Sequence, residues 1–242
     1  MSQTPMPRSS VTQDYYELLE EVKKYVVRIE TPAGHGTGFV VYRNPGVLTV
    51  ATAYHVVENS YKWNFPITIA KEGDTQPVIL PADPNKRFLE VYPEYDLALL
   101  SFPPELMPKA PDTMLPLVQK GYYRKPGCEV GWCGYPVIPP PGKTLCFFGG
   151  WLSTFDEPTG TYFVDGTVIN GVSGGPCFCR GDGDRAMLVG IVTAFYPSYS
   201  MGQPLQGLGV VQAVEPIHGP IEKLHKSWEE QVKTINKQKV KA

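Results

Sequence analysis

Short runs of β-branched and aromatic residues recur along most of the chain, and turns rich in glycine and proline separate them. Runs of this kind are typical of strands. We expect strands in the segments 26–30, 38–42, 46–53, 67–70, 77–81, 96–102, 129–133, 144–150, 161–169, 187–195 and 207–214. Strand and helix patterns do not alternate between these segments. The chain is therefore predicted to be all-β, built from antiparallel barrels or sandwiches.

Helical periodicity is found at the two ends of the chain, and a short helical turn is expected at His55, where the preceding strand ends. Residues 14–25 carry apolar positions at helical spacing, namely Tyr16, Leu19 and Val22. A second helix is expected over residues 219–236, where one helical face collects Ile221, Leu224, Trp228, Val232 and Ile235. Pro220 suits the first turn of that helix. Residues 1–12 are polar and rich in proline and serine, so a flexible tail is expected there.

Composition narrows the classes of function. The 242 residues, 42% of them hydrophobic, are enough for one large β domain or two small ones. Basic and acidic residues number 22 and 24, and the resulting net charge of −2 argues against nucleic acid as a partner held by bulk electrostatics. The sequence has neither a basic-then-apolar leader nor a run of about eighteen apolar residues. These features predict a cytoplasmic protein that does not contact a membrane.

Cysteine usage favours reduced thiols. The sequence has five, Cys128, Cys133, Cys146, Cys177 and Cys179, which is an odd number and too few for a disulfide framework at this length. The alternative is a zinc site formed by all of them except Cys146, because Cys177 and Cys179 would share one strand face. Their spacings match no common zinc-finger pattern, so neither a metal nor a cofactor is expected.

One stretch surrounds a serine with glycines. In "INGVSGGPCFC", Ser173 stands among Gly171, Gly174 and Gly175. Glycines permit a tight turn that exposes the hydroxyl, and they allow backbone N–H groups to point at an oxyanion. The alternative is an ordinary glycine-rich turn with an exposed serine. Nucleophilic catalysis would require a base and an orienting acid as well.

Candidates for both groups precede the serine. His55 ends the apolar run in "TVATAYHVV", and Asp96 stands at the start of the strand segment in "PEYDLALLSF". Each residue alone is explained by packing or by a turn. Together with Ser173 they follow the order His–Asp–Ser, which is the chymotrypsin-type order. The combination predicts a catalytic triad that works through an acyl-enzyme.

With these motifs the sequence resembles the trypsin-like serine peptidases of chymotrypsin fold, and more specifically their HtrA/DegP-like branch. The resemblance rests on "GHGTGFVVY", "TAYHVV", "YDLALLSF", "EVGWCGYP", "INGVSGGP", "GIVTAF" and "GLGVVQAVEPI". No segment resembles the PDZ domain that often follows in HtrA proteins, and Val172 replaces the usual Asp or Asn before the serine. The resemblance implies a polypeptide substrate and a double β-barrel domain over residues 13–238. The barrels would span roughly 25–115 and 120–216, followed by the C-terminal helix.

The resemblance also assigns roles around the triad. The N–H groups of Gly171 and Ser173 would bind the oxyanion. Thr193 sits where the family places a hydroxyl that supports the catalytic aspartate. The strand through Thr193, Ala194 and Phe195 would pair with the substrate backbone. Among the other histidines, His35 would approach the leaving-group side of the cleft, whereas both C-terminal histidines, His218 and His225, are expected to face solvent.

The pocket for the residue before the scissile bond is implied by the same resemblance. Its floor would be Thr167, and its walls would include Phe195 and Gly209. None of these three is charged, and Phe195 stands where a deep pocket would have glycine. Asp165 resembles an aspartate that HtrA proteins carry without basic specificity. These residues predict cleavage after small or medium uncharged residues.

Two alternatives belong to other classes of protein. The stretch also satisfies G-x-S-x-G, the nucleophile elbow of α/β-hydrolase esterases, but that elbow requires a helix directly after the serine, and "GGPCFCRGDGDR" predicts none. The second alternative is a catalytically silent or partner-activated module that uses the same fold to hold a peptide. The presence of all three triad residues disfavours the silent module.

Overall fold

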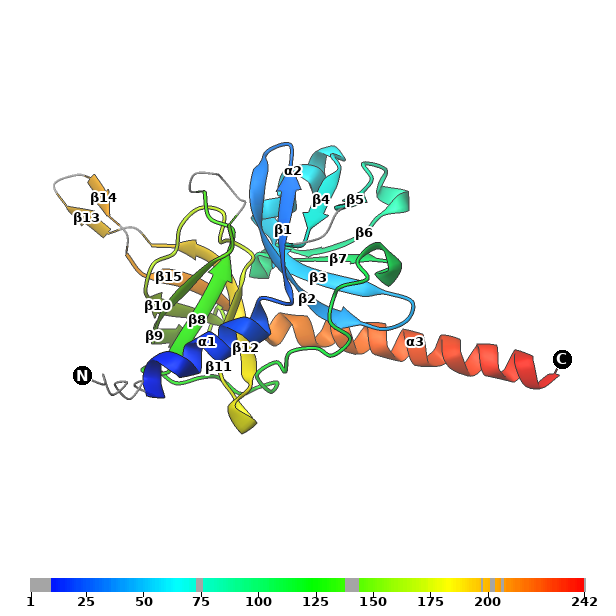
Figure 1. Cartoon of the computed structure of the whole chain (residues 1–242). Coiled ribbons are helices and arrows are strands. Elements are labelled where there is room, and N and C mark those ends of the chain that lie inside the picture. Colours follow the sequence, from blue (N-terminus) through cyan, green and yellow to red (C-terminus); the bar gives the residue numbers. More distant parts are fainter. Residues whose placement is uncertain are drawn as a thin grey trace, which may run out of the picture.

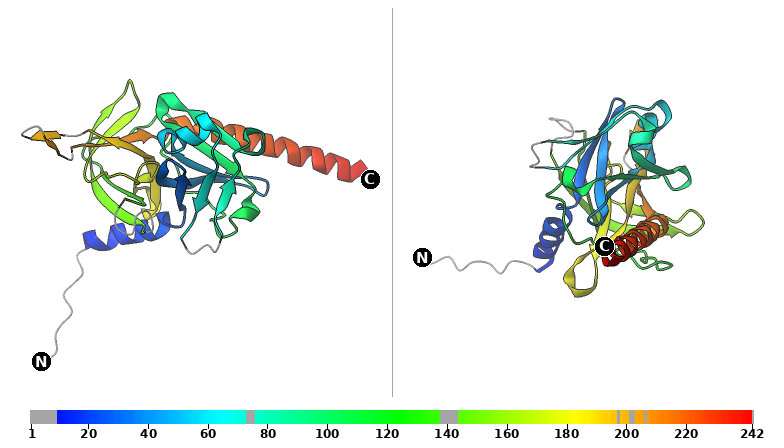
Figure 2. Two further views of the ribbon diagram at one scale, coloured as in Figure 1. Left: turned by 90° about the horizontal axis from the view of Figure 1, so that it is seen from above. Right: turned by 90° about the vertical axis from the view of Figure 1, so that its right-hand side faces the viewer.

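The chain folds mainly into antiparallel strands, as the sequence predicts. The structure is a computed structural model that describes residues 10–72, 76–137, 144–196, 198–200, 203–205 and 207–241. The two main β units stand side by side, one formed by the earlier strands and one by the later strands (Figure 1). Helix α1 (Ser10–Val22) lies along one side of them, and helix α3 (Glu215–Lys241) runs beneath the first unit and projects past it (Figure 2).

The later strands close into a barrel in the order β10-β15-β12-β11-β8-β9. The bounds of these six strands are β8 (Glu129–Gly134), β9 (Cys146–Asp156), β10 (Thr161–Asp165), β11 (Pro176–Arg180), β12 (Ala186–Phe195) and β15 (Gly209–Ala213). Closure leaves no unpaired strand edge. A small hairpin is formed separately by β13 (Ser198–Ser200) and β14 (Gln203–Leu205).

The earlier strands form a seven-stranded antiparallel sheet in the order β5-β4-β1-β2-β3-β7-β6. Their bounds are β1 (Val26–Thr31), β2 (Gly34–Arg43), β3 (Leu48–Ala53), β4 (Ile67–Ala70), β5 (Val78–Leu80), β6 (Phe88–Tyr92) and β7 (Leu97–Phe102). This unit differs from a closed barrel because β5 and β6 each pair on one side only. The described residues thus form a mostly β double barrel, in which the second barrel is closed and the first is a half-barrel sheet.

The central strands of the seven-stranded sheet are buried along most of their length. All six residues of β3 are buried, and seven consecutive residues of β2 are also buried, as expected for strands covered on both faces. The expected strands omit β6, whose five residues (FLEVY) are all at least partly exposed, although four of them are apolar. The expected strand segments also omit β11, where a proline and two cysteines stand in place of the usual β-branched residues, although Cys177 and Cys179 were expected to share a strand face and are both buried in β11.

Helix α1 begins and ends earlier than residues 14–25. Leu18 and Val22 are buried, and the Glu21 carboxylate accepts hydrogen bonds from the Arg185 side chain at 2.6 and 2.9 Å and from the Ala186 amide at 2.8 Å. These contacts hold the helix against the hairpin that joins β11 to β12. The predicted tail is described only from residue 10 onward, where it is helical; residues 1–9 lie outside the described residues.

Helix α3 begins at Glu215, four residues before the predicted start, and runs to Lys241. Ile217 in its first turn is fully buried, and the Glu215 carboxylate accepts a hydrogen bond from the Gly121 amide at 3.0 Å. Pro220 consequently lies inside the helix, where its missing N–H removes one helical hydrogen bond. Farther along, the Trp228 ring packs directly over Gly46, at which a Cβ would lie 2.6 Å from the ring.

Among the helices that the structure describes, none has the length and apolar character needed to cross a membrane.

Candidate active site

His55 is the second residue of helix α2 (Tyr54–Trp63), which begins directly after β3. The N-cap residue, Ala53, has no side chain that could bond to the first free N–H groups of the helix. Asp96 supplies those bonds from another part of the chain. Its backbone carbonyl accepts from the Tyr54 amide at 2.9 Å, and its Oδ1 accepts from the His55 amide at 2.9 Å.

Asp96 reaches this position through an uncommon backbone conformation. It follows the short helix η2 (Pro93–Tyr95) with a φ of 47°, in the left-handed region that asparagine and aspartate adopt more readily than other side chains. Its second carboxylate oxygen, Oδ2, lies 2.7 Å from His55 Nδ1. The imidazole is therefore oriented by the same carboxylate that caps its helix. The His55 side chain is 44% exposed and is accessible to a substrate.

The opposite end of α2 is held by Arg87, which is buried. Its guanidinium donates to the carbonyl oxygens of Phe65 and Ser60, each at 2.7 Å. A cation at a helix C-terminus interacts favourably with the helix dipole. Burial lowers the pKa of Arg87 from its usual range, but an arginine remains charged at neutral pH. Helix α2 is thus fixed at both ends, and His55 with it.

Ser173 lies in a turn between β10 and β11 that only glycine can form. Gly171 has a φ of 91° and Gly174 a φ of 85°, both in the left-handed region. The neighbouring atoms also leave no room for a side chain at these two positions. A Cβ on Gly171 would lie 2.4 Å from the Tyr135 carbonyl oxygen, and one on Gly174 would lie 2.0 Å from the Thr37 carbonyl oxygen.

The amides of this turn fall into two groups. Those of Val172, Gly174 and Gly175 donate to the carbonyl oxygens of Ile169 at 3.2 Å, Val192 at 2.7 Å and Val172 at 2.9 Å. The amides of Gly171 and Ser173 have no acceptor in the part of the chain that the structure describes. The Gly171 amide shares its peptide group with the Asn170 carbonyl, which accepts from the Val137 amide at 2.8 Å. The Ser173 amide shares its peptide group with the Val172 carbonyl, which accepts from the Gly175 amide. Since the C=O and N–H of a trans peptide point in opposite directions, both amides are directed away from those contacts.

The serine turn packs beside the start of α2. A Cβ on Gly36 would lie 2.6 Å from a methyl carbon of Val56 and 3.1 Å from the Ser173 carbonyl oxygen. A Cβ on Gly174 would lie 2.9 Å from the Ala53 amide. The Ser173 hydroxyl donates to the Thr193 carbonyl oxygen at 3.4 Å, and no hydrogen bond joins it to His55. The structure thus brings His55 and Asp96 into contact and places the serine turn beside Ala53 and Val56, which lie on either side of His55 in the sequence.

Among the described residues, no hydrogen bond joins the Thr193 hydroxyl to Asp96. That hydroxyl donates to the Val210 carbonyl oxygen at 3.3 Å, because β12 has a register shift here against β15. Ala194 and Phe195 end β12 and are exposed, and Phe195 pairs with Gly209. Thr167 is exposed as well, and its carbonyl oxygen accepts from the Trp132 indole N–H at 3.0 Å.

The other histidines differ in their surroundings. His218 was expected to face solvent but is half-buried, and its Nε2 lies 2.9 Å from the Val118 carbonyl oxygen, because α3 begins earlier than predicted. His225 is exposed and lies 3.3 Å from Glu229. The buried Nε2 of His35 has no partner among the described residues, and it lies 3.0 Å from the position of a Cβ on Gly171.

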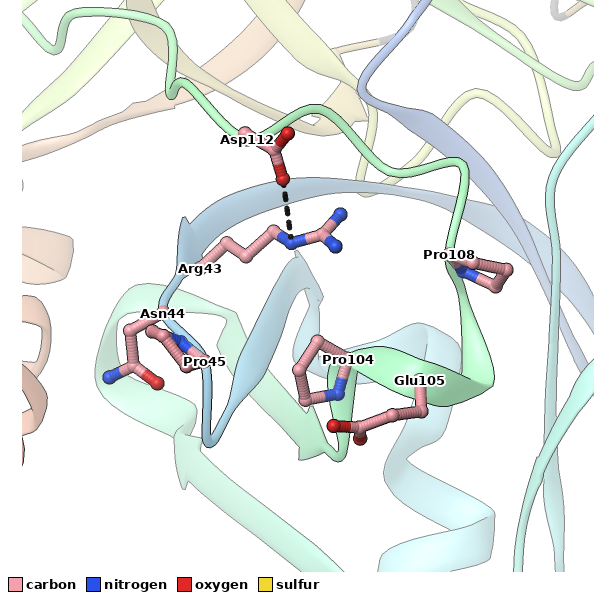
Figure 3. A pocket seen from close by; sticks show the side chains of 7 residues that line it. All are labelled: Arg43, Asn44, Pro45, Pro104, Glu105, Pro108 and Asp112. Atoms are coloured by element: carbon pink, nitrogen blue, oxygen red, sulfur yellow. Dashed lines mark ion pairs between the residues drawn. The ribbon is translucent and has the colours of Figure 1, made fainter.

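A pocket of about 610 Å³ lies far from these residues (Figure 3). It is lined by Arg43, Asn44, Pro45, Pro104, Glu105, Pro108 and Asp112. The Arg43 guanidinium points toward Asp112, with 3.4 Å between Nε and Oδ1. Arg43 ends β2, and six residues of strand separate it from Thr37 near the serine turn, or about 20 Å. This pocket contains none of the expected site residues.

All five cysteines are free thiols. Burial raises the pKa of Cys133 and Cys177. A hydrogen bond between the Cys128 and Cys179 side chains lowers the pKa of Cys128 to about 7, and Arg124 contributes in the same direction. The same bond, together with burial, raises the pKa of Cys179. In the described part of the chain no three His, Cys, Asp or Glu side chains gather closely enough to hold a metal ion.

Cys128 is therefore expected to be the most reactive thiol of the folded protein. The thiolate is the nucleophile, so the alkylation rate of Cys128 should rise as pH increases through about 7 and then level off. Mass spectrometry after brief iodoacetamide treatment measures each site, and Cys146, also half-buried, is the internal comparison. Unfolding without reductant should expose all five thiols to the reagent. Faster labelling of Cys146, or a Cys128 rate that still climbs above about pH 8.5, would contradict the assignment.

Comparisons with known proteins agree with this fold. The family model of the trypsin-like peptidase domain matches residues 36–191. Solved structures that share the fold include three with 16–19% identity to this chain. They are Rv3671c from M. tuberculosis H37Rv in an inactive form (18% identity, TM-score 0.58, 93% of this chain and 98% of that chain), Deg5 (16%, 0.63, 88% and 94%) and the serine protease of human pathogenic astrovirus (19%, 0.53, 81% and 92%).

No curated protein matched this chain. The family match covers most of the chain, including the segments of His55, Asp96 and Ser173, and the double barrel is the expected chymotrypsin-like fold. The expectation of a trypsin-like serine peptidase is confirmed. The chain belongs to the trypsin-like peptidase family and is a serine endopeptidase.

Proposed function

We propose that Ser173, His55 and Asp96 are the nucleophile, the general base and the orienting acid of this peptidase. The observation that carries the proposal is the Asp96 carboxylate bonded to His55 Nδ1 at 2.7 Å, beside a serine flanked by two amides without acceptors. With Nδ1 donating to Asp96, His55 Nε2 is left as the acceptor for a serine proton. Rotation of the Ser173 side chain away from Thr193 would direct the hydroxyl toward His55.

The proposed reaction follows from these positions. Ser173 Oγ attacks the scissile carbonyl carbon as His55 takes its proton, and Asp96 stabilises the imidazolium. The amides of Gly171 and Ser173 donate to the oxyanion, and loss of one such donor typically costs about 10²–10³ in rate. His55 then protonates the leaving amine, and water repeats the sequence on the acyl-enzyme. The substrate backbone would pair with the exposed end of β12 at Ala194 and Phe195.

The fold bears on the two alternatives to a peptidase, namely an esterase and a silent or partner-activated module. An α/β-hydrolase elbow requires a helix after the serine, whereas strand β11 starts three residues later in an antiparallel barrel, which argues against an esterase of that fold. A silent or partner-activated module shares the fold of the peptidase and is distinguished by chemistry alone. A fluorophosphonate probe should label the wild-type protein and leave Ser173→Ala unlabelled. Equal absence of label from both proteins would favour the silent module.

Residues around the expected specificity pocket favour a shallow apolar cavity. The Trp132 ring is fully buried directly beneath Gly166, since a Cβ there would lie 2.4 Å from it. Its indole N–H holds the Thr167 carbonyl, so the ring takes up the space below the proposed floor. Phe195 stands opposite Gly209 on the neighbouring strand and is 40% exposed. A cationic side chain in such a cavity would lose its hydration without gaining a buried carboxylate partner.

Cleavage is therefore expected after small or medium uncharged residues such as Val, Ala, Leu or Thr. A misfit of one methylene should cost about 1–3 kcal/mol in discrimination. A peptide library sequenced after digestion measures this preference, with Ser173→Ala as the blank. Phe195→Gly is the matched variant and should widen acceptance toward larger apolar residues. Dominant cleavage after Lys or Arg would refute the assignment and would point to Asp165 as the acid in the pocket.

A further inference from the structure

Thr37 is a buried hydroxyl residue whose polar atoms are all engaged, and it lies on β2 of the first barrel. Its amide donates to the Ser173 carbonyl oxygen at 2.9 Å, and its carbonyl accepts from the Thr52 hydroxyl at 2.6 Å. Its Oγ1 accepts from the Tyr135 amide at 2.9 Å and donates to the Gly171 carbonyl oxygen at 2.7 Å. One residue thus joins β2 and β3 of the first barrel to the serine turn and the end of β8 in the second.

The direction of the hydroxyl bond is fixed by its neighbours. An amide can only donate, so the lone pair of Thr37 Oγ1 receives the Tyr135 N–H. The hydroxyl proton is then left for the Gly171 carbonyl, which can only accept. The surroundings are shaped around this atom, because a Cβ on Gly134 would lie 2.6 Å from Thr37 Oγ1.

The bond matters because Gly171 has little conformational preference of its own. Glycine rotates freely about φ and ψ, so the peptides on both sides of Gly171 need external anchors to keep its N–H directed at an oxyanion. On the N-terminal side, the Asn170 carbonyl is held by the Val137 amide at 2.8 Å. On the C-terminal side, the Gly171 carbonyl is held by Thr37, and the amide of the same peptide makes only a long 3.2 Å bond to Ile169.

We infer that Thr37 is a positioning residue that holds the Gly171 and Ser173 peptides in the oxyanion-binding arrangement and couples that arrangement to the barrel that carries His55. The inference rests on the proposed function. Without the hydroxyl, the Gly171–Val172 peptide loses its carbonyl anchor and can turn its oxygen toward the oxyanion position. The substrate ground state does not depend on those donors, so the loss falls on kcat and leaves KM nearly unchanged.

The test compares Thr37→Val with Thr49→Val. Thr49 is also fully buried in the first barrel, and its hydroxyl bonds to Ser101 at 2.9 Å, away from the serine turn. Both variants lose a buried hydroxyl bond and should melt at lower temperature. Only Thr37→Val should lower kcat, by about 10²–10³, as for the loss of one oxyanion donor. Thr37→Val should also weaken the binding of a peptide boronate inhibitor by a similar factor, while the affinity for the product peptide stays unchanged. Thr37→Ser, which keeps the hydroxyl, should restore kcat.

Each outcome separates the inference from the proposed function. Wild-type protein that neither cleaves peptides nor takes a fluorophosphonate label would overturn the proposed function itself. Active wild type together with a folded Thr37→Val of unchanged kcat would overturn the inference alone, as would an equal loss of kcat in Thr49→Val. If Thr37→Val does not fold, the kcat of Thr37→Cys is compared with that of Thr37→Ser, since a thiol is a weaker hydrogen-bond donor than a hydroxyl. A kcat at least about tenfold lower for the cysteine variant supports the inference, and equal values refute it.

Discussion

Replacement of His55 by alanine is expected to lower kcat/KM by about 10⁶, which is the scale of loss when a triad base is removed. In the proposed mechanism His55 Nε2 accepts the Ser173 proton, because Nδ1 is bonded to Asp96. Helix α2 should persist, because its N-terminal N–H groups are capped by Asp96 and its other end by Arg87. Cleavage of a chromogenic peptide with an uncharged residue before the scissile bond measures the loss.

Two comparisons make this result specific to the triad. His225→Ala removes an exposed histidine from α3 and should leave kcat/KM unchanged. The double variant His55→Ala with Ser173→Ala should be no worse than either single variant, because residues that act as a unit are not additive. A His55→Ala protein that keeps more than about one hundredth of the wild-type rate would contradict the assigned base, since general base catalysis alone contributes about 10²–10⁴.

Asp96→Asn is expected to lower kcat by about 10⁴ while the fold is retained. The substituted carboxamide has one acceptor oxygen where the Asp96 carboxylate has two, and the His55 amide already occupies Oδ1. The carboxamide nitrogen would then face His55 Nδ1 and donate to it, which forces the proton onto Nε2. In that tautomer the imidazole cannot accept the serine proton. Loss of the negative charge at the N-terminus of α2 should also cost about 0.3–1 kcal/mol of stability.

The matched control is Asp83→Asn. Asp83 caps the short helix η1 (Pro84–Lys86), where its Oδ1 accepts from the Asn85 amide at 2.9 Å, so the substitution makes the same chemical change in a cap outside the site. Its kcat should equal that of wild type. Steady-state kinetics and thermal unfolding of both variants separate the tautomer effect from the cap effect. An Asp96→Asn enzyme within about tenfold of the wild-type kcat would show that Asp96 acts only as a cap.

The local sequence was sufficient for the class of fold and for the candidate chemistry. Apolar runs bounded by turn residues located β4 (Ile67–Ala70) to the residue, and the order of His55, Asp96 and Ser173 identified the candidate triad. The glycines of the serine turn were also readable, because a positive φ and the absence of a Cβ are properties of single positions. These features depend on propensity and periodicity within a few neighbouring residues, which the chain carries wherever it folds.

Other features were decided by contacts between distant segments. Asp96 caps a helix that begins 42 residues earlier at Tyr54, and the Thr37 hydroxyl meets a carbonyl that is 134 residues away in the sequence at Gly171. Strand β6 pairs with the edge of β7, a partner that its own five residues do not indicate, and α3 starts at Glu215 because Ile217 is buried against the barrel. The periodicity of a sequence does not indicate which carbonyl oxygen will accept a hydrogen bond from a threonine hydroxyl. That pairing is set when the two barrels pack together and every buried polar group must find a partner.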